Sequence, residues 1–226
     1  MTRSVVLIVI SLLILLSSTL IYALPYGSQL CKNPEYTCYK VKKGDSWKKL
    51  FRDETKRDLV MRINRMNTSL YRGLTIAIPV SEGDDALSFS PLPAHIDSPG
   101  RKLILVSIKD LAFGAYDADG TLEHWGPVST ARGYCPDIGR RCNTARGQFE
   151  IHDKKGEGCV STRYPVGRGG APMPYCMFFN GNFALHGSYE VPGYNASHGC
   201  IRLFVNDAQW LNEEFTEGER VKVVVR

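Results

Sequence analysis

Short hydrophobic runs separated by turn residues characterise the chain from Arg101 to its end. Gly, Pro, Asp and Asn stand between these runs, a pattern typical of strands rather than helices. The "DADG" sequence lies between two apolar and aromatic runs and predicts a β-hairpin. The predicted strands lie in the segments KLILVSI, LAFGAYDADGTLEHW, GQFEIHD, CMFFNGNFALHG and RVKVVV.

One segment of this region has helical periodicity. In "VNDAQWLNEEF" the residues Ala208, Leu211 and Phe215 recur at the spacing of one helix face, and Asn206 is the expected N-cap. Many short strands with a single helix predict a mainly β, sandwich-like domain over residues 101–226.

Residues 36–80 follow a different pattern, which predicts a small α+β unit. A strand is expected in "YTCYKVKKG", a helix in "DSWKKLFR" with Asp45 as N-cap, and a second helix in "RDLVMRINRMN". A closing strand in "LTIAIP" is ended by Pro79. The order is therefore βααβ. Residues 81–100 are rich in Pro, Gly, Ser and Asp and are expected to be a linker.

The N-terminus has the layout of a secretory signal peptide. "MTR" is followed by the apolar run "SVVLIVISLLILLSS", and a small residue, Ala23, marks the expected cleavage site. The alternative is an uncleaved membrane anchor, because residues 4–24 are long enough to span a bilayer. Both readings predict that the remainder of the chain is exported.

An exported chain is expected to oxidise its cysteines in pairs. The sequence contains seven. Neighbouring cysteines in loop-like sequence predict the bridges Cys31–Cys38, Cys135–Cys142 and Cys159–Cys176. Cys200 is left without a near partner, so it is either a buried small apolar residue or a reactive thiol.

The net charge is +5, a small excess of Lys and Arg over Asp and Glu. No dense basic block or basic helix face accompanies it, so nucleic acid is not an expected partner. A mild positive charge suits an anionic polymer such as a cell wall, and it equally suits an ordinary solvated surface.

The chemistry-bearing stretch is "HGSYEVPGYNASHGCIRL", which contains His186, His198 and Cys200. A thiol needs a neighbouring base to act as a nucleophile at neutral pH, and His186 at the end of an expected strand is the candidate. Zinc is the alternative for these three side chains, but the Cys-x-x-Cys and His-x-x-x-His pairs typical of zinc sites do not accompany them. A third reading makes the histidines hydrogen-bonded structural residues.

The combination of "HGS" with "SHGCIRL" resembles the signature of the L,D-transpeptidase catalytic domain, the YkuD-like family. "RKLILVSIKDLAFGAYDADG", "TARGQFEI" and "GERVKVVV" are similar to the family's opening hairpin, central motif and closing strand. Three departures stand out: Ala145 replaces an expected Pro, the loop between His186 and Ser197 is short, and four cysteines look like additions that staple a lid.

The earlier unit resembles a LysM module, through "VKKGDSW", the Asn of "INRMN" and "LYRGLTIAIP" with Gly73 and Pro79. That resemblance implies binding to N-acetylglucosamine-containing glycans such as peptidoglycan. The other reading is a small structural domain without affinity for sugar.

The transpeptidase resemblance also assigns roles to residues. Cys200 matches the nucleophile and His186 the general base and acid, while the carbonyl of Gly187 would orient the imidazole. Gly199 and Cys200 would supply the N–H groups of an oxyanion hole. The remaining matches line the site, with His198 among the catalytic residues and Ser188, Ser197 and Arg202 as substrate-binding residues.

The implied function is an exported cysteine transpeptidase acting on peptidoglycan in the periplasm or cell envelope of a bacterium. It would form a thioester on Cys200, release D-Ala and pass the acyl group to an amine. Two alternatives remain open, namely a hydrolase using the same cysteine and a wall-binding protein with an inactive catalytic domain. No metal or other cofactor is expected, and membrane contact is expected only if the signal segment stays uncleaved.

Overall fold

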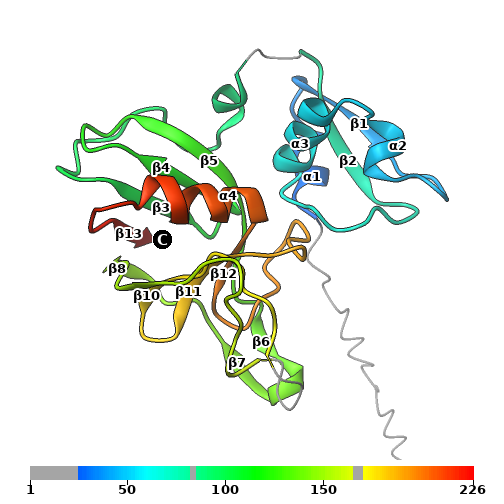
Figure 1. Ribbon diagram of the computed structural model, residues 1–226. Coiled ribbons are helices and arrows are strands. Elements are labelled where there is room, and N and C mark those ends of the chain that lie inside the picture. Colours follow the sequence, from blue (N-terminus) through cyan, green and yellow to red (C-terminus); the bar gives the residue numbers. More distant parts are fainter. Residues whose placement is uncertain (1–24, 82–84, 165–169) are drawn as a thin grey trace, which may run out of the picture.

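The computed structural model describes residues 25–81, 85–164 and 170–226 (Figure 1). The predicted signal peptide, residues 1–23, therefore lies outside the described residues. Within the described ranges no helix has the length and apolar character needed to cross a membrane.

The N-terminal module has the predicted order of strand, helix, helix and strand, preceded by a short helix that the sequence pattern did not predict. Its elements are α1 Gly27–Leu30, β1 Tyr36–Lys40, α2 Trp47–Leu50, α3 Glu54–Ile63 and β2 Thr75–Pro79. β1 and β2 form an antiparallel pair. The helices pack on it through a core that includes Trp47, Val60 and Ile76. Burying this apolar surface is what lets so small a unit fold.

The predicted helix start at Asp45 is wrong. Ser46 is the N-cap of α2, and its hydroxyl accepts from the Lys49 N–H. The Asp45 carboxylate instead accepts from the Lys42 N–H at 2.7 Å and the Tyr39 hydroxyl at 2.8 Å. Asp45 therefore closes the turn before the helix, a role that short acidic side chains fill as readily as capping.

The second half of the chain is mainly β, as predicted, but its main sheet is single and curled rather than split into two. The strands are β3 Leu103–Ser107, β4 Ala112–Tyr116, β5 Leu122–Ser129, β6 Gly133–Cys135, β7 Arg140–Cys142, β8 Gly147–Glu150, β9 Asp153–Lys154, β10 Met177–Asn180, β11 Phe183–Gly187, β12 Ile201–Leu203 and β13 Lys222–Val225. Nine of them form one sheet in the order β8-β13-β3-β4-β5-β12-β11-β10-β9, and β6–β7 form a separate hairpin.

Contacts between distant strands show the curl. The rings of Phe149 on β8 and Phe179 on β10 lie 5.3 Å apart, although these strands stand near opposite edges of the sheet. Right-handed twist brings the two halves of such a sheet face to face around a shared core. The packing is therefore sandwich-like, because the two halves of the sheet enclose one core. The topology differs from the expected sandwich, because both halves belong to a single sheet.

The predicted C-terminal helix packs on this core (Figure 1). It comprises α4 Val205–Trp210, continued by a π-helical turn Leu211–Phe215. Ala208, Leu211 and Phe215 are all buried, as the periodicity predicted. The predicted cap is wrong, because Phe204 precedes the helix without any side-chain capping bond and Asn206 lies inside the first turn.

The segment predicted as a linker is packed against the nine-stranded sheet where it is described. It contains a 3₁₀ turn, Ala86–Phe89, whose Ala86 carbonyl accepts from the Trp125 indole at 2.7 Å. The Pro93 carbonyl accepts from the Tyr116 hydroxyl at 2.8 Å, and Leu92 is buried. Residues 85–100 therefore form part of the folded domain in this structure.

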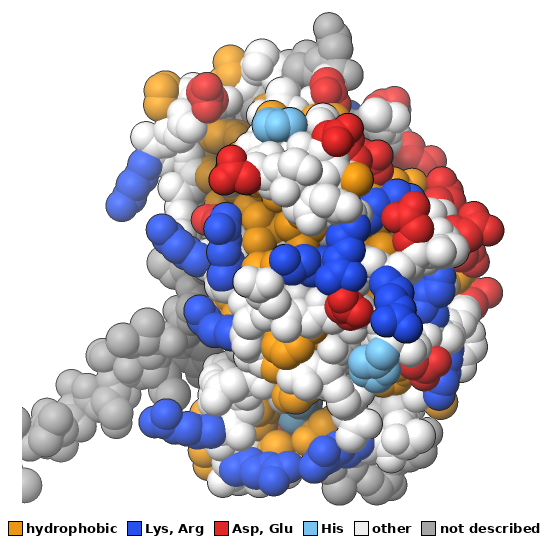
Figure 2. All heavy atoms as spheres, turned by 90° about the vertical axis from the view of Figure 1, so that its left-hand side faces the viewer, with side chains coloured by type: hydrophobic (Ala, Val, Ile, Leu, Met, Phe, Trp, Pro, Cys, Tyr) orange, Lys and Arg blue, Asp and Glu red, His pale blue; other side chains and the backbone are white. Residues whose placement is uncertain are grey.

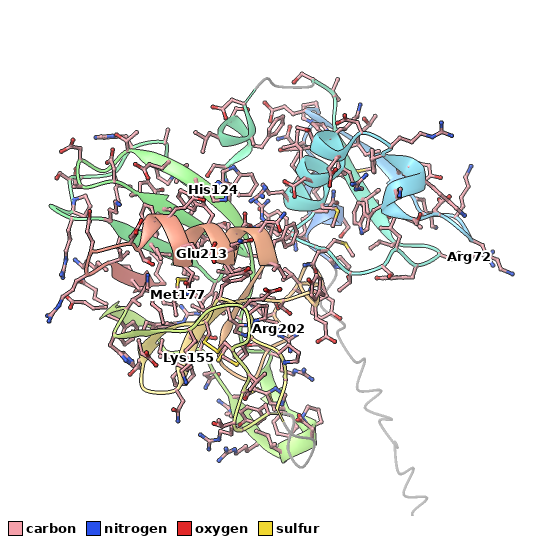
Figure 3. The ribbon with its side chains drawn as sticks, viewed as in Figure 1. Arg72, His124, Lys155, Met177, Arg202 and Glu213 are labelled. Carbon is pink, nitrogen blue, oxygen red and sulfur yellow. A yellow bond between two sulfur atoms is a disulfide. The ribbon has the colours of Figure 1, made fainter. Side chains whose placement is uncertain are left out.

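A buried ion pair joins the module to the second domain. Arg62 on α3 donates to both carboxylate oxygens of Asp207 on α4, at 3.0 and 3.1 Å, and to the Trp125 carbonyl at 2.7 Å. The His124 ring lies 2.8 Å from the same carboxylate, on the side of β5 that faces α4 (Figure 3). Burial favours the neutral carboxyl, but Arg62 and His124 outweigh it and hold the pKa of Asp207 below its usual value.

All three predicted disulfides are present: Cys31–Cys38, Cys135–Cys142 and Cys159–Cys176. Cys200 is the free cysteine, as the pairing argument predicted.

Candidate active site

Two paired parallel strands lie at the predicted nucleophile and base. β11 and β12 pair in parallel register, with His186 opposite Arg202 and Leu185 opposite Ile201. Cys200 immediately precedes β12, so it enters the sheet beside Ala184. Neighbouring positions in parallel strands project to the same face, which places His186 and Arg202 on one side of the sheet. Cys200, two residues before Arg202, lies at the strand end on that side.

His186 is a buried, neutral imidazole. Its Nδ1 lies 2.9 Å from the Gly187 carbonyl, which can only accept, so Nδ1 carries the proton and Nε2 keeps its lone pair. Burial lowers the pKa of His186 to about 4, the bond to Gly187 opposes this, and the Arg202 guanidinium adds to it. This is the tautomer that a general base needs.

Cys200 is partly exposed and holds a protonated thiol. Burial raises its pKa, while a hydrogen bond with the Ala184 backbone and the charge of Arg202 act in the opposite direction. Its Sγ lies 3.8 Å from the Asn182 carbonyl. In this structure Cys200 therefore holds a neutral thiol and His186 a neutral imidazole.

The turn before Cys200 is fixed by hydroxyl groups. Ser197 is buried, and its hydroxyl donates to the Cys200 carbonyl at 2.6 Å and accepts from the Gly199 N–H at 3.0 Å. Thr144 donates to the Gly199 carbonyl at 2.8 Å. A Cβ on Gly199 would lie 2.6 Å from the Phe183 ring, so only glycine fits here. These contacts present Cys200 in a single position.

His198 projects away from this turn toward a neighbouring hairpin. Its Nε2 lies 2.6 Å from Asp137, and its ring stacks on Tyr164 with centroids 4.4 Å apart. Asp137 belongs to the loop that joins β6 to β7, which the Cys135–Cys142 bridge closes. His198 thus fastens a disulfide-closed hairpin to the turn that carries Cys200.

Arg202 and Ser188 occupy the other edge of the site. Arg202, partly exposed, donates to the Glu190 carbonyl at 3.1 Å and lies 3.5 Å from its carboxylate (Figure 3). The Ser188 N–H donates to the Leu203 carbonyl at 2.8 Å and extends the pairing of β11 with β12. The short loop between the two histidines is therefore bound to β12 by both residues.

The potential metal ligands do not converge as the zinc alternative requires. Among the described residues, one cluster of three such side chains exists, formed by Cys135, Asp137 and His198. The Cys135 sulfur is already in a disulfide and cannot act as a thiolate ligand. His186 and Cys200 do not belong to this cluster.

Comparison with known proteins decides the family. The family model for the L,D-transpeptidase catalytic domain, YkuD, matches residues 101–224, more than half of the chain. The chain belongs to this L,D-transpeptidase family. The matched range contains all eight of the site residues predicted from the sequence. No curated protein matches the chain.

One solved L,D-transpeptidase is similar in fold, and others align with lower TM-scores. An L,D-transpeptidase from Xylanimonas cellulosilytica is 24% identical with a TM-score of 0.54, over 70% of this chain and 74% of that one. One from Stackebrandtia nassauensis is 23% identical with a TM-score of 0.46, over 58% of each chain. One from Mycobacterium smegmatis is 20% identical with a TM-score of 0.44, over 56% of this chain and 58% of that one.

Sequence reasoning missed several residues that shape this transpeptidase site. Asp137 and Tyr164, the partners of His198, lie far from it in sequence, and only the Cys135–Cys142 pair indicated that a stapled segment lies nearby. No sequence pattern indicated that Thr144 would donate to the Gly199 carbonyl. Asn67, which contacts the loop after His186, lies in the other module.

Proposed function

We propose that this L,D-transpeptidase is an exported enzyme that acylates Cys200 with a peptidoglycan stem peptide and transfers the acyl group to an amine. The observation that carries the proposal is the register of β11 and β12. It places a neutral His186, with its Nε2 lone pair, on the strand beside Cys200, the free cysteine. Membership of the L,D-transpeptidase family supports transpeptidation as the reaction class. The positions of Cys200 and His186 support a route through a cysteine acyl-enzyme.

The first half of the reaction forms a thioester. The Cys200 sulfur attacks the carbonyl carbon of the third stem residue as His186 Nε2 takes the thiol proton. The bond to D-Ala then breaks, and His186 returns the proton to the leaving amine. In the second half an acceptor amine attacks the thioester, its proton passes to His186, and the thiol is restored.

Burial keeps His186 unprotonated in the resting site. An imidazole with a pKa near 4 is uncharged at neutral pH, so its Nε2 lone pair is available to accept a proton. The imidazolium that forms is stabilised by the Gly187 carbonyl, which accepts from Nδ1.

Backbone N–H groups would stabilise the oxyanion. Cys200 N–H is the first of the two proposed donors. Gly199 N–H, the second, donates to Ser197 in the resting structure, so its use requires a small shift of the turn. Ser197, being buried, would act by holding this turn rather than by touching substrate. Arg202 and Ser188, at the exposed edge, are proposed to contact the carboxylates and carbonyls of the stem.

The remaining parts of the proposal concern location and attachment. Three disulfides are compatible with export, as is the signal-like N-terminal sequence. The βααβ order of the N-terminal module supports a LysM-like role in holding glycan strands. On one face, Lys and Arg side chains lie mainly across the middle and along the lower edge, while most Asp and Glu side chains lie at the top and right (Figure 2). Such a distribution is compatible with contact with an anionic polymer such as a cell wall.

Intact mass spectrometry with a tetrapeptide stem fragment tests the proposal. The expected result is a mass gain equal to the stem minus D-Ala, absent from the Cys200→Ala variant. Adding an amine should then move the acyl group to that amine. Loss of the adduct to water alone would favour the hydrolase, and no adduct on a free Cys200 would contradict the thioester route.

A further inference from the structure

The loop that follows the catalytic histidine is held by the N-terminal module as well as by its own domain. This loop, residues 188–193, is bound by backbone groups of the module at two points. The Tyr26 N–H donates to the Gly193 carbonyl at 2.9 Å, and the Asn67 N–H donates to the Val191 carbonyl at 2.9 Å. Met66 also forms a β-bridge with Pro192.

The Asn67 side chain completes this contact as a backbone mimic. Its Nδ2 donates to the Ser188 carbonyl at 2.7 Å, and its Oδ1 accepts from the Val191 N–H at 2.9 Å. One amide thus spans the loop and fixes the separation of two backbone groups three residues apart. A side-chain amide can do this because it presents a donor and an acceptor side by side, as a peptide group does.

The clamped loop is directly connected to the proposed site. Ser188 lies two positions after His186, and its N–H is bound to Leu203 on β12. The Glu190 carbonyl accepts from Arg202, which stands opposite His186 in the sheet. A shift of the loop therefore moves the carbonyl that holds Arg202 and the edge along which substrate would lie.

The module is anchored well enough for Asn67 to act at a fixed place. The Arg62–Asp207 pair is buried at the junction. Arg65, also buried, donates to the Asp110 carbonyl at 3.1 Å and packs between the rings of Tyr26 and Trp125. These contacts hold the module against the second domain, so the Asn67 side chain can stay at one position on the 188–193 loop.

We infer that Asn67 is a positioning residue of the active site, through which the N-terminal module sets the 188–193 loop for acylation of Cys200. The inference rests on the proposed function for its kinetic consequence. It assigns the module a role in the reaction itself, beyond any affinity for glycan. Asn67 acts through Ser188 and Val191 and does not touch the reacting atoms.

The test compares Asn67→Ala with Asn33→Ala in the full chain. Asn33 is a matched control, because its amide also makes one donated and one accepted bond, but both are with Glu35 inside the module. Acylation by the tetrapeptide stem is followed by mass spectrometry over a range of stem concentrations. Rates are divided by the concentration of folded protein, taken for each variant from its urea unfolding curve, so a change in folded fraction does not contribute.

The expected result for Asn67→Ala is a loss of about 10- to 100-fold in acylation efficiency, the effect of displacing a site edge by roughly 1 Å. Part of the loss should appear as a higher KM for the stem. A variant that only had less folded protein would lose rate in proportion and keep the KM of the parent. Asn33→Ala should stay within about twofold of the parent. Asn67→Ala acylating as efficiently as Asn33→Ala would overturn the inference.

Hydrogen exchange separates this failure from failure of the proposed function. The Val191 amide, bonded to Asn67, should exchange faster in Asn67→Ala and not in Asn33→Ala. A parent protein that forms no acyl-enzyme contradicts the proposed function. Unchanged exchange of residues 188–193 in Asn67→Ala contradicts the positioning role, whether or not the parent is acylated.

Discussion

Replacing Asp207 by Ala should destabilise the whole chain, although Asp207 lies on α4 and has no part in the proposed chemistry. The carboxylate is buried and forms an ion pair with Arg62, which belongs to the N-terminal module. Its removal leaves the guanidinium of Arg62 with the Trp125 carbonyl and with Asp58, which is about half exposed. A buried cation without its main counter-charge is the costly outcome.

The structure indicates the size of the effect. Both side chains are nearly inaccessible, at 8% and 2% exposure, so solvent does little to screen the pair. Breaking a buried pair of this kind costs about 3–5 kcal/mol, and Arg62→Met should cost a similar amount by leaving the carboxylate with the His124 ring as its remaining side-chain partner. The double variant Arg62→Met/Asp207→Ala should cost less than either single variant, because neither buried charge of the pair then remains without its partner.

Urea unfolding of the parent, the two single variants and the double variant measures these values as a double-mutant cycle. Two single variants that each lose less than about 1 kcal/mol would refute the reasoning, since exposed pairs contribute that little. A double variant whose loss is the sum of the single losses would also refute it, because the two groups would then be uncoupled.

The same pair determines a pH dependence. The folded-state pKa of Asp207 is depressed below its ordinary value of 3.8, so the carboxylate contributes stability above that value. The contribution is lost as pH falls through the folded-state pKa. The difference in unfolding free energy between the parent and Asp207→Ala should therefore be constant near neutral pH and shrink below pH 3.8. A difference that grows on acidification would contradict this assignment.

Three further predictions concern the site. Gly199→Ala should reduce acylation by about 100-fold, because the new Cβ overlaps the Phe183 ring and displaces the turn, and unchanged single-turnover rates would refute the close fit. Replacing both Cys159 and Cys176 by Ser should cost about 3 kcal/mol in urea unfolding, the value for a loop of 17 residues, and a loss below 1 kcal/mol would show that the bridge does not constrain the unfolded chain. Alkylation of Cys200 by iodoacetamide should rise with pH, with a midpoint above the ordinary thiol pKa because burial raises it, and a midpoint below that pKa would show an activated resting thiolate.

Local patterns predicted local structure well. The disulfides followed from close cysteine spacing, and the strands around "DADG" followed from a turn between apolar runs. Ala208, Leu211 and Phe215 were predicted to share a buried face because helical periodicity reports burial directly. Cys200 and His186 lie close together in sequence and match the family's signature, and the structure pairs the strands at which they lie. Their roles as nucleophile and base stay predictions.

Long-range pairings were beyond sequence reasoning. Arg62 and Asp207 are 145 residues apart, and an isolated Arg on a helix ordinarily indicates solvent exposure. From the sequence, Asn67 was expected only to end a helix. A single sequence does not show which distant loop its side-chain amide contacts. The curl of the sheet depends on twist accumulated over nine strands, which alternation of residues does not encode.

The most direct measurement is the mass of the protein after incubation with the tetrapeptide stem, beside Cys200→Ala and His186→Gln. We expect an adduct of stem minus D-Ala on the parent, none on Cys200→Ala, and acylation slowed at least about 100-fold in His186→Gln. An adduct that persists in Cys200→Ala, or that forms at the parent rate in His186→Gln, would contradict the central claim that these two residues carry the reaction.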